Sequence, residues 1–316
     1  MRSGAREAAF GATPDRIPRG AGTAEERWLV AVAFGGQGCY AAAATELARL
    51  AVDPAVPLRV AAHAAVTRAA HLRQLGGHAI ARRYDAVGLR LATAALSRAT
   101  PATDGATPDD GLDAAAARID ALVGLAADAI GLGDPATAER LLAVAAPGLA
   151  AHPSWRPTTR AGWVRVELAL VRGRADAAVA PAAAALAAAC HGASLRHVLK
   201  SRIVLAVAQA AAGVTTAAAA VTELDAATAE CARSGLLPLC WPAGLAALDL
   251  GVNPQLRIND QVAPSAGTAL GGRSEGTTRR RHAVRAALNV IEERSDAVGK
   301  RQMGESVWIP RPATLM

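Results

Sequence analysis

The sequence predicts an all-α protein built from paired helices. Alanine supplies 83 of the 316 residues, whereas aromatic residues make up only 3%. Alanine has the highest helix propensity and little preference for strands, and its small side chain lets helices approach one another closely. Hydrophobic residues make up 52% of the chain, which is enough for a sizeable buried core. Glycines that recur between helical stretches predict where the helices turn.

The first ordered helix is expected to begin near Thr23. Residues 1–22 are rich in glycine, proline and arginine, and they are predicted to form a disordered leader. Thr23 precedes Glu26 by three residues, which is the spacing of a capping box, and the apolar Trp28 follows shortly after.

Five glycines separate the helical stretches, mostly at intervals of about 40 residues, and an alanine stands five residues after each of them. The glycines are Gly36, Gly76, Gly133, Gly173 and Gly213, and the alanines are Ala41, Ala81, Ala138, Ala178 and Ala218. Glycine ends a helix readily because it tolerates the left-handed conformation at the C-cap. A small residue early in the next helix then lets that helix pack closely on its partner. An extra loop at residues 99–111 accounts for the longer interval between Gly76 and Gly133.

This spacing predicts five antiparallel helix hairpins and a short sixth helix. Apolar residues stand at helical spacing around the glycines, as Leu122, Leu125 and Ala126 do before Gly133. The expected hairpins occupy residues 23–51, 57–98, 112–151, 157–190 and 194–234, and the sixth helix occupies residues 243–250. The repeat domain is therefore expected to span residues 23–250, with the short helix covering the end of a stack.

Two of the turns resemble those of tetratricopeptide repeats (TPRs). The segments Leu132–Leu142 and Arg172–Ala178 place a glycine in the turn and a small residue five positions later, as that family does. The period here is near 40 residues rather than about 34, and the family's aromatic positions are largely alanine or leucine. At the level of architecture the resemblance covers residues 23–235. It implies a TPR-like α-solenoid, a right-handed superhelical stack whose concave groove holds a peptide or a partner helix. A generic α-solenoid or an irregular bundle is the alternative.

The C-terminal residues 251–316 differ in composition, because alanine becomes scarce and polar residues increase. Residues 253–276 are predicted to be a linker. One amphipathic helix is expected at residues 279–296. Its apolar positions are Val284, Ala287, Leu288 and Ile291. The remainder, with Trp308-Ile309-Pro310-Arg311-Pro312 near its end, is expected to be disordered and basic.

Charge reverses sign between the second and third expected hairpins. Residues 54–100 carry seven arginines and one acid, Asp85, whereas residues 101–140 carry eight acids and two arginines. One interpretation is mutual neutralisation of neighbouring hairpins. The other is an arginine-lined groove for an acidic peptide or a phosphate at this junction. The expected members of that groove are Arg73, His78, Arg82 and Arg83. Arg82 and Arg83 are adjacent on a helix, so they cannot both point into one site.

The sequence carries neither a phosphate-binding GxxxxGK[ST] loop nor an HExxH zinc motif. The cysteines form no CxxC pair and are predicted to be free thiols in a reducing cytoplasm. The histidine cluster of His63, His71 and His78 is expected to face solvent or to lie in turns. Trp155, Trp163 and Trp241 could anchor a ligand in a groove, although tryptophans on helices more often belong to the core. We therefore expect no cofactor, no metal and no enzymatic activity.

The leading hypothesis is a cytoplasmic scaffold or adaptor that binds another protein or an acidic peptide. The second is an accessory transcription-regulatory or nucleic-acid-associated protein, whose contacts would be Arg279, Arg280 and Arg281. An enzyme of unfamiliar type is the third, and it would require a deep pocket with convergent acids. No membrane span is expected, because the two uncharged stretches, residues 28–45 and 203–222, are rich in alanine and interrupted by glycine turns.

Overall fold

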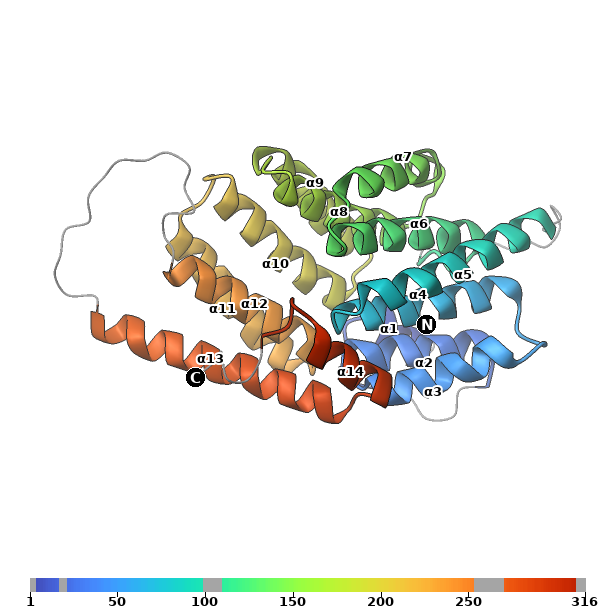
Figure 1. Ribbon diagram of the computed structural model, residues 1–316, viewed down its shortest axis with the longest axis horizontal. Coiled ribbons are helices and arrows are strands. Elements are labelled where there is room, and N and C mark those ends of the chain that lie inside the picture. Colours follow the sequence, from blue (N-terminus) through green and yellow to red (C-terminus); the bar gives the residue numbers. More distant parts are fainter. Residues whose placement is uncertain (1–3, 17–21, 99–109, 253–269, 311–316) are drawn as a thin grey trace.

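The computed structural model describes residues 4–16, 22–98, 110–252 and 270–310, and in these ranges it contains fourteen helices and no strand (Figure 1). The prediction of an all-α protein is confirmed. The helices are α1 (Gly4–Phe10), α2 (Ala24–Gly36), α3 (Tyr40–Val52), α4 (Leu58–Gln74), α5 (His78–Arg98), α6 (Ala114–Gly131), α7 (Pro135–Ala151), α8 (Trp155–Val171), α9 (Asp176–His191), α10 (Leu195–Ala211), α11 (Ala217–Arg233), α12 (Leu237–Val252), α13 (Leu270–Glu293) and α14 (Ala297–Glu305). Within the described ranges, no helix combines the length and the apolar character that a bilayer span requires.

Neighbouring helices pack in pairs: α2 with α3, α4 with α5, α6 with α7, α8 with α9, α10 with α11, and α12 with α13. We call the earlier member of each pair a first helix and the later member a second helix. The residues expected to form five hairpins are those of α2 to α11. The expected short helix at residues 243–250 is part of the longer α12, because Pro242 lies inside that helix instead of ending it.

The first helices form one continuous layer. Each packs on the next in chain order, from α2 through α4, α6, α8 and α10 to α12. The second helices α3, α5, α7, α9 and α11 each pack against their own first helix and the following one. Most first helices are therefore enclosed on several sides, whereas a second helix buries one face.

The turn glycines have the conformation that the sequence predicts at four of five positions. The glycines with a positive φ at the expected turns are Gly76, Gly133, Gly173 and Gly213, and the first three are followed by the buried Ala81, Ala138 and Ala178. Gly36 is instead the last residue of α2, and Gly38 adopts the positive φ, so the buried alanine is Ala43 rather than Ala41. After Gly213 the turn continues to Thr216, the N-cap of α11, and the buried alanine is correspondingly Ala220.

The capping box predicted at Thr23 is confirmed at the start of α2. The Thr23 hydroxyl accepts a hydrogen bond from the Glu26 amide at 3.1 Å, and the Glu26 carboxylate accepts one from the Thr23 amide at 3.1 Å. These two bonds satisfy amide groups that the first turn of α2 leaves without an intrahelical partner.

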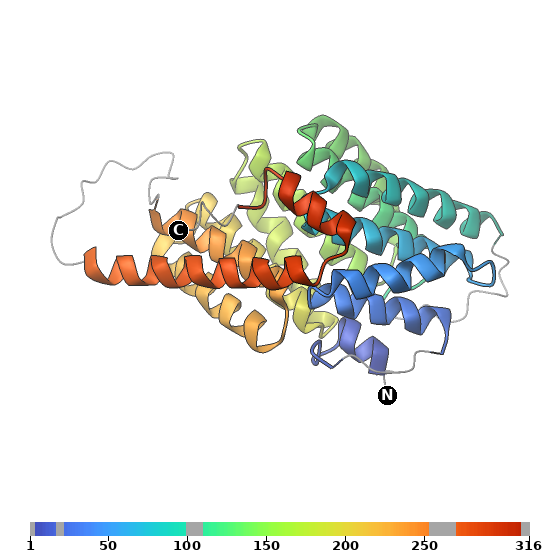
Figure 2. The same cartoon turned by 60° about the horizontal axis from the view of Figure 1, so that its bottom comes forward.

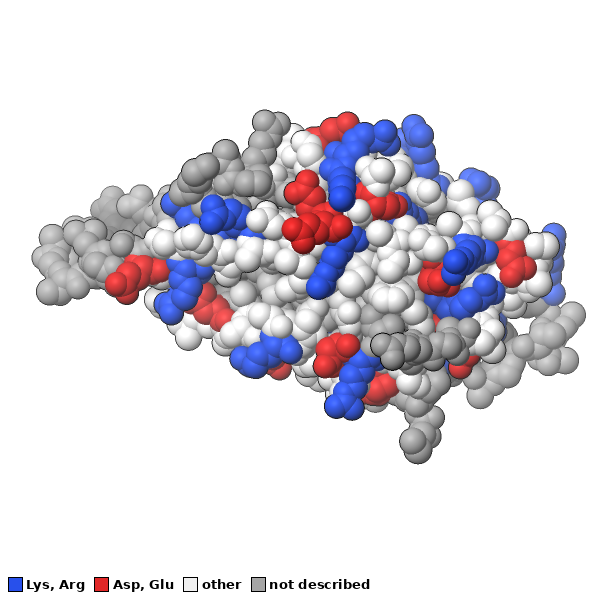
Figure 3. Space-filling view, turned by 90° about the horizontal axis from the view of Figure 1, so that it is seen from below, with Lys and Arg blue, Asp and Glu red and all other residues white. Residues whose placement is uncertain are grey.

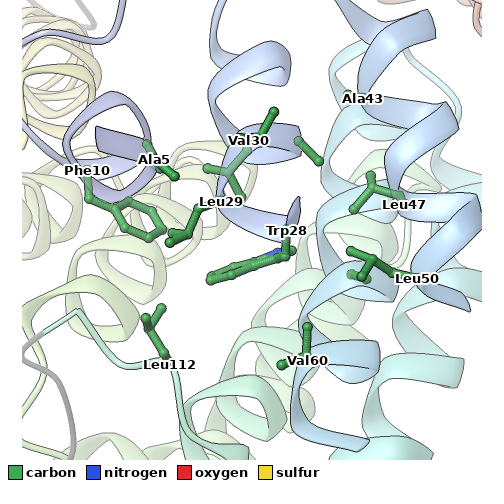
Figure 4. Packing of buried hydrophobic residues seen from close by; sticks show 14 of the residues in the cluster. Ala5, Phe10, Trp28, Leu29, Val30, Ala43, Leu47, Leu50, Val60 and Leu112 are labelled. Atoms are coloured by element: carbon green, nitrogen blue, oxygen red, sulfur yellow. The ribbon is translucent and has the colours of Figure 1, made fainter. Parts of the chain in front are cut away.

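The N-terminal segment differs from the expected disordered leader at residues 1–22. Its residues Gly4–Phe10 form α1, which buries Ala5, Ala8, Ala9 and Phe10. The Phe10 ring lies 6.0 Å from Trp28 and 6.3 Å from Trp155 in a core cluster that joins α1, α2, α3 and α4 (Figure 4). The buried alanines and Phe10 lie at helical spacing, and this short apolar face outweighs the surrounding glycine and proline. Residues 1–3 and 17–21 of the expected leader lie outside the described residues.

The C-terminal segment also differs from the expected disordered tail. The helix expected at residues 279–296 is contained in α13 up to residue 293, and α14 follows it. All four predicted apolar positions, Val284, Ala287, Leu288 and Ile291, are buried, in two core clusters, one of which includes Tyr40 and Leu75. In Figures 1 and 2, α13 runs beside α12, and α14 crosses toward α4 and α5, where Asp296 at its N-cap pairs with Arg68 at 2.7 Å. Residues 253–269 and 311–316 of this segment lie outside the described residues, as do 99–109 of the expected loop.

The layer of first helices curves until its two ends meet. Arg196 of α10 donates a hydrogen bond to the Val32 carbonyl of α2 at 3.1 Å. A side chain added at Gly38 would lie 3.5 Å from Pro238 at the start of α12. In addition, the Ala41 amide donates to the Arg294 carbonyl at 2.8 Å, directly after α13. We call this contact region between the N-terminal and C-terminal helices the seam.

Candidate binding pocket

A cavity of about 140 Å³ lies beside the seam. Among the described residues, its lining comes from α1 and from all six first helices, and no second helix contributes. The charged lining residues are Arg73, Arg156, Arg160, Glu167, Arg196 and Lys200. Five of these six are cationic, so the pocket concentrates positive charge inside the protein.

Aromatic rings and aliphatic side chains form the rest of the wall. Trp163 of α8 stacks on the His197 imidazole of α10 with ring centroids 5.5 Å apart and an interplanar angle of 19°. The Trp163 indole nitrogen donates to the Ser201 hydroxyl at 2.9 Å, which fixes the orientation of the ring. Val32 and Leu239 add aliphatic surface. The cations therefore lie in a partly apolar setting, where charge interactions are stronger than in bulk water.

Arg73 of α4 is bound by two carboxylates. Its Nε donates to Asp128 at 2.8 Å, and its Nη2 donates to Asp85; both aspartates are fully buried. Gly124 of α6 allows this approach, because a side chain there would overlap the Asp85 carboxylate. Burial raises the pKa of Asp85 to about 8, against the opposing charge of Arg73. Arg73 is thus part of a buried ion-pair network that joins α4, α5 and α6.

Arg156 and Arg160 of α8 share a single carboxylate, that of Asp120. Arg156 is buried and donates to Asp120 at 2.5 Å, and also to the backbone carbonyls of Asp110 at 2.7 Å and Gly111 at 2.6 Å. Arg160 places its Nε 2.9 Å from Asp120. Burial acts to raise the pKa of Asp120, but the charges of Arg156 and Arg160 outweigh it and hold that pKa below its usual range. The two terminal nitrogens of Arg160 make no hydrogen bond with any described residue.

Arg196 and Lys200 of α10 have no carboxylate partner among the described residues. Arg196 bonds to the Val32 carbonyl, and the Lys200 ammonium lies 4.2 Å from the centroid of the Trp163 ring. Burial, together with the nearby positive charge of Arg160, lowers the pKa of Arg196 to about 10. Burial also lowers the pKa of Lys200 to about 8, against the opposing charge of Glu167. Both groups are therefore less stable as cations here than in water.

The four groove residues expected from the sequence do not lie together. Arg73 lines the pocket, and His78 lies 3.5 Å from the same Asp128 that binds Arg73. Arg82 and Arg83 are exposed and line a separate shallow depression between α5, α6 and α7. Arg73 is on the first helix α4, whereas Arg82 and Arg83 lie on the outward-facing part of α5, and this explains the separation.

The predicted nucleic-acid cluster lies on α13, away from the pocket. Arg279 is exposed, and Arg281 is half-buried. Arg280 donates two hydrogen bonds to Asp225 of α11, at 2.8 and 2.6 Å. One of the three arginines therefore already holds a carboxylate of the chain itself. On the face shown in Figure 3, basic and acidic side chains are interspersed rather than gathered by sign.

Sequence reasoning missed four of the five pocket cations: Arg156, Arg160, Arg196 and Lys200. A usable signal was the spacing of Arg156, Arg160, Trp163 and Glu167, which places chemistry-bearing side chains along one face of α8. Their convergence with α10 and α2, however, depends on the closure of the helix layer, which local periodicity does not encode.

Two of the three clustered histidines differ from the expected solvent-facing or turn positions. His63 and His71 of α4 are buried, as is His197 of α10, whereas His78 is half-buried and directly follows the turn before α5. Burial lowers the pKa of His63 to about 4 and of His71 to about 3, and it places the pKa of His197 well below the ordinary value. These residues are therefore neutral near pH 7. In the part of the chain that the structure describes, no group of three or more potential ligands could hold a metal ion.

No family model matches the chain, and neither a curated protein nor a solved structure is similar to it. The class of protein is therefore defined by the fold and the pocket alone. The chain is an all-helical protein whose inner layer of helices encloses a polar, cation-rich cavity.

Proposed function

We propose that the protein is a TPR-like helical-repeat scaffold whose inner pocket binds an acidic peptide segment of a partner protein. In this proposal the helix pairs form a superhelical stack, the first helices face its concave side, and the pocket is the deepest part of that side. An acidic side chain of the ligand would enter the pocket, and the rest of the peptide would lie beside the exposed Gln74 and Glu167 at its edge.

The observation that carries this proposal is the origin of the lining residues. The pocket is lined by first helices and α1 only, and it places Arg196 and Lys200 without a carboxylate partner among the described residues. Arg196 and Lys200 are half-buried. Desolvated cations without an anion are unfavourable for the fold, so their presence is better explained by a ligand than by stability. Charge-assisted hydrogen bonds from such groups are among the strongest that a protein offers to a carboxylate.

Binding is favoured over catalysis by the state of the carboxylates. Asp120 and Asp128 are each held by a guanidinium group. Asp85, whose pKa burial raises to about 8, is fully buried and does not line the pocket. A general acid or base must reach the substrate. Among the described residues, Glu167 is the one carboxylate that lines the pocket, at its exposed edge, so the lining offers no pair of carboxylates for acid–base work.

A fluorescent decapeptide of aspartate and glutamate tests the proposal by fluorescence anisotropy with the full chain. The double charge reversal Arg196→Glu plus Lys200→Glu should weaken binding by about a hundredfold or more, since each lost charge-assisted bond contributes about 1.5–3 kcal/mol. The matched control is Arg82→Glu plus Arg83→Glu, which changes the net charge equally on the exposed surface of α5 and should change affinity by less than about threefold.

Equal losses in the two double variants would show that the peptide responds only to net charge, and the proposal would then be wrong. It would also be wrong if no acidic peptide bound the wild-type chain at low salt. Circular dichroism checks the fold of both variants. A helical signal equal to that of the wild type shows that a loss of binding is not caused by unfolding.

A further inference from the structure

Three cationic groups in the pocket keep hydrogen-bond donors that the protein does not use. The terminal nitrogens of Arg160 are free of described partners, and Arg196 uses Nη1 for the Val32 carbonyl and leaves its remaining donors open. The Lys200 ammonium makes a cation–π contact with Trp163, and this contact consumes none of its three N–H donors. These groups come from two neighbouring helices, α8 and α10, so their donors approach the pocket from different directions.

Charge balance in the pocket region favours a dianion. Its five cations are faced by four carboxyl groups: Asp85 and Asp128 at Arg73, Asp120 shared by Arg156 and Arg160, and Glu167 at the exposed edge. Burial raises the pKa of Asp85 to about 8, so this carboxyl is mostly uncharged near pH 7. The five cations then face three charged carboxylates, Asp120, Asp128 and Glu167, which leaves an excess of two positive charges. A single carboxylate ligand would therefore leave excess charge buried.

The size of the cavity fits a phosphate group. Its volume is about 140 Å³, and a protein cavity of roughly 150 Å³ accommodates a benzene molecule, which has six heavy atoms. A phosphate with its ester carbon also has six heavy atoms. The larger part of such a ligand would extend past the exposed Gln74 and Glu167.

We propose that the pocket is specific for the phosphate group of a phosphate monoester, with Arg160, Arg196 and Lys200 as its hydrogen-bond donors. This inference uses the pocket of the proposed function and names the anion that it binds. A monoester carries about two negative charges at neutral pH and three terminal oxygens, which matches the charge excess and the three donor groups. Arginine suits bidentate contact with phosphate, and lysine adds a point charge.

Isothermal titration of the full chain at pH 7.5 with phenyl phosphate and with benzoate tests the anion. Phenyl phosphate should bind about tenfold or more tightly than benzoate, because it places two charges against the donors. Arg196→Gln and, independently, Lys200→Met should each weaken phenyl phosphate binding by about tenfold to a hundredfold. Equal affinity for the two probes, or unchanged binding in both variants, would overturn the inference.

Arg202→Gln is the matched control. Arg202 lies on the same helix α10, but it points away from the pocket and pairs with Glu223 and Glu230, each at 2.8 Å. Its replacement should leave phenyl phosphate affinity within about twofold of wild type. Because Lys200→Met adds no polar group to the pocket and removes a destabilised cation, it remains informative even where Arg196→Gln fails to fold.

Two further ligands separate this inference from the proposed scaffold function. If a phosphoserine decapeptide binds more tightly than phenyl phosphate, the natural ligand is a phosphorylated segment of a partner protein. If the peptide binds more weakly, the natural ligand is a free small phosphate monoester. If phenyl phosphate binds through Arg196 but no acidic peptide does, the scaffold proposal fails and the phosphate site stands. If the acidic peptide binds through Arg196 and phenyl phosphate does not, the scaffold stands and the phosphate inference fails.

Discussion

The first and second helices of the same pairs differ sharply in what they bury. The first helix α6 buries twelve of its 18 residues, including Asp120 and Asp128, whereas its partner α7 buries three of 17, none of them charged. Likewise α8 buries Arg156 and two tryptophans, but α9 buries only four alanines. The second helices α7 and α9 act as small-residue supports, while most of the buried charge lies in the first helices; Asp85 of the second helix α5 is the exception, and it pairs with Arg73 of α4. This division teaches that buried charge follows enclosure by neighbouring helices rather than local composition.

The largest expected effect comes from breaking a buried ion pair in a first helix. Asp120→Ala should destabilise the protein by about 3–5 kcal/mol, because it leaves Arg156 and Arg160 charged and without their shared carboxylate. Urea denaturation at pH 7 measures this change. On the second helix α7, Glu139→Ala removes an exposed ion pair with Arg172 and should cost less than about 1 kcal/mol. Similar losses in the two variants would contradict the division between the helices.

Acid should destabilise the protein through histidines of the first helices. The pKa values of His63 and His71 are lowered from 6.5 to about 4 and about 3, chiefly by burial and also by nearby cations such as Arg156 and Arg196. Since the folded pKa is the lower one, the stabilising contribution is complete above pH 6.5 and is lost as the pH falls toward 4. We expect a loss of a few kcal/mol over this range in urea titrations.

His63→Phe should reduce this acid dependence, because phenylalanine keeps the ring packing on Trp28, whose centroid lies 4.8 Å away, without a titrating group. His191→Gln replaces an exposed histidine at the end of the second helix α9 and should leave the dependence unchanged. An identical pH profile for wild type and His63→Phe would show that another group controls acid stability.

The smallest expected effect is a gain in stability. Lys200→Met should stabilise the protein by up to about 1 kcal/mol at pH 7, because burial disfavours the charged lysine. The groups facing Lys200 are Glu167 and Arg160 of α8, Arg73 of α4 and Arg196 of α10. The folded pKa of about 8 lies below the ordinary 10.5, so the gain should be complete below pH 8 and vanish by about pH 10.5. A loss of stability in this variant would mean that Lys200 supports the fold instead of a ligand.

The local part of the fold could be predicted from the sequence. Glycine at Gly133 and Gly173 indicates a left-handed turn because other residues rarely adopt that conformation, and the alanines Ala138 and Ala178 lie buried where the spacing placed them. The short α1 was missed because a single helical turn of apolar residues gives a weak signal amid glycine and proline. These successes and failures all depend on residues that are near one another in the chain.

The pocket could not be predicted in the same way. Arg73 was identified from the excess of arginine in residues 54–100. The other pocket cations, such as Arg160 and Arg196, look like ordinary basic residues on alanine-rich helices. They converge only because α2 and α10 meet at the seam, and helical periodicity carries no information on that meeting. Arg73 and Asp128 form an ion pair between the arginine-rich and the acid-rich segments, as the interpretation of mutual neutralisation expects. Asp120 of the acid-rich segment instead pairs with arginines that come later in the chain.

The seam has a consequence for how the chain folds and how its site can be regulated. Pairs such as α6 and α7 close over a few residues, but the contact of Val32 with Arg196 spans 164 positions and that of Arg68 with Asp296 spans 228. Loop-closure entropy opposes such distant contacts, so they are expected to form late and to open before the local pairs do. A ligand bound beside Arg196 would therefore stabilise the closed seam. The fraction of molecules with a closed seam would rise with the concentration of that ligand.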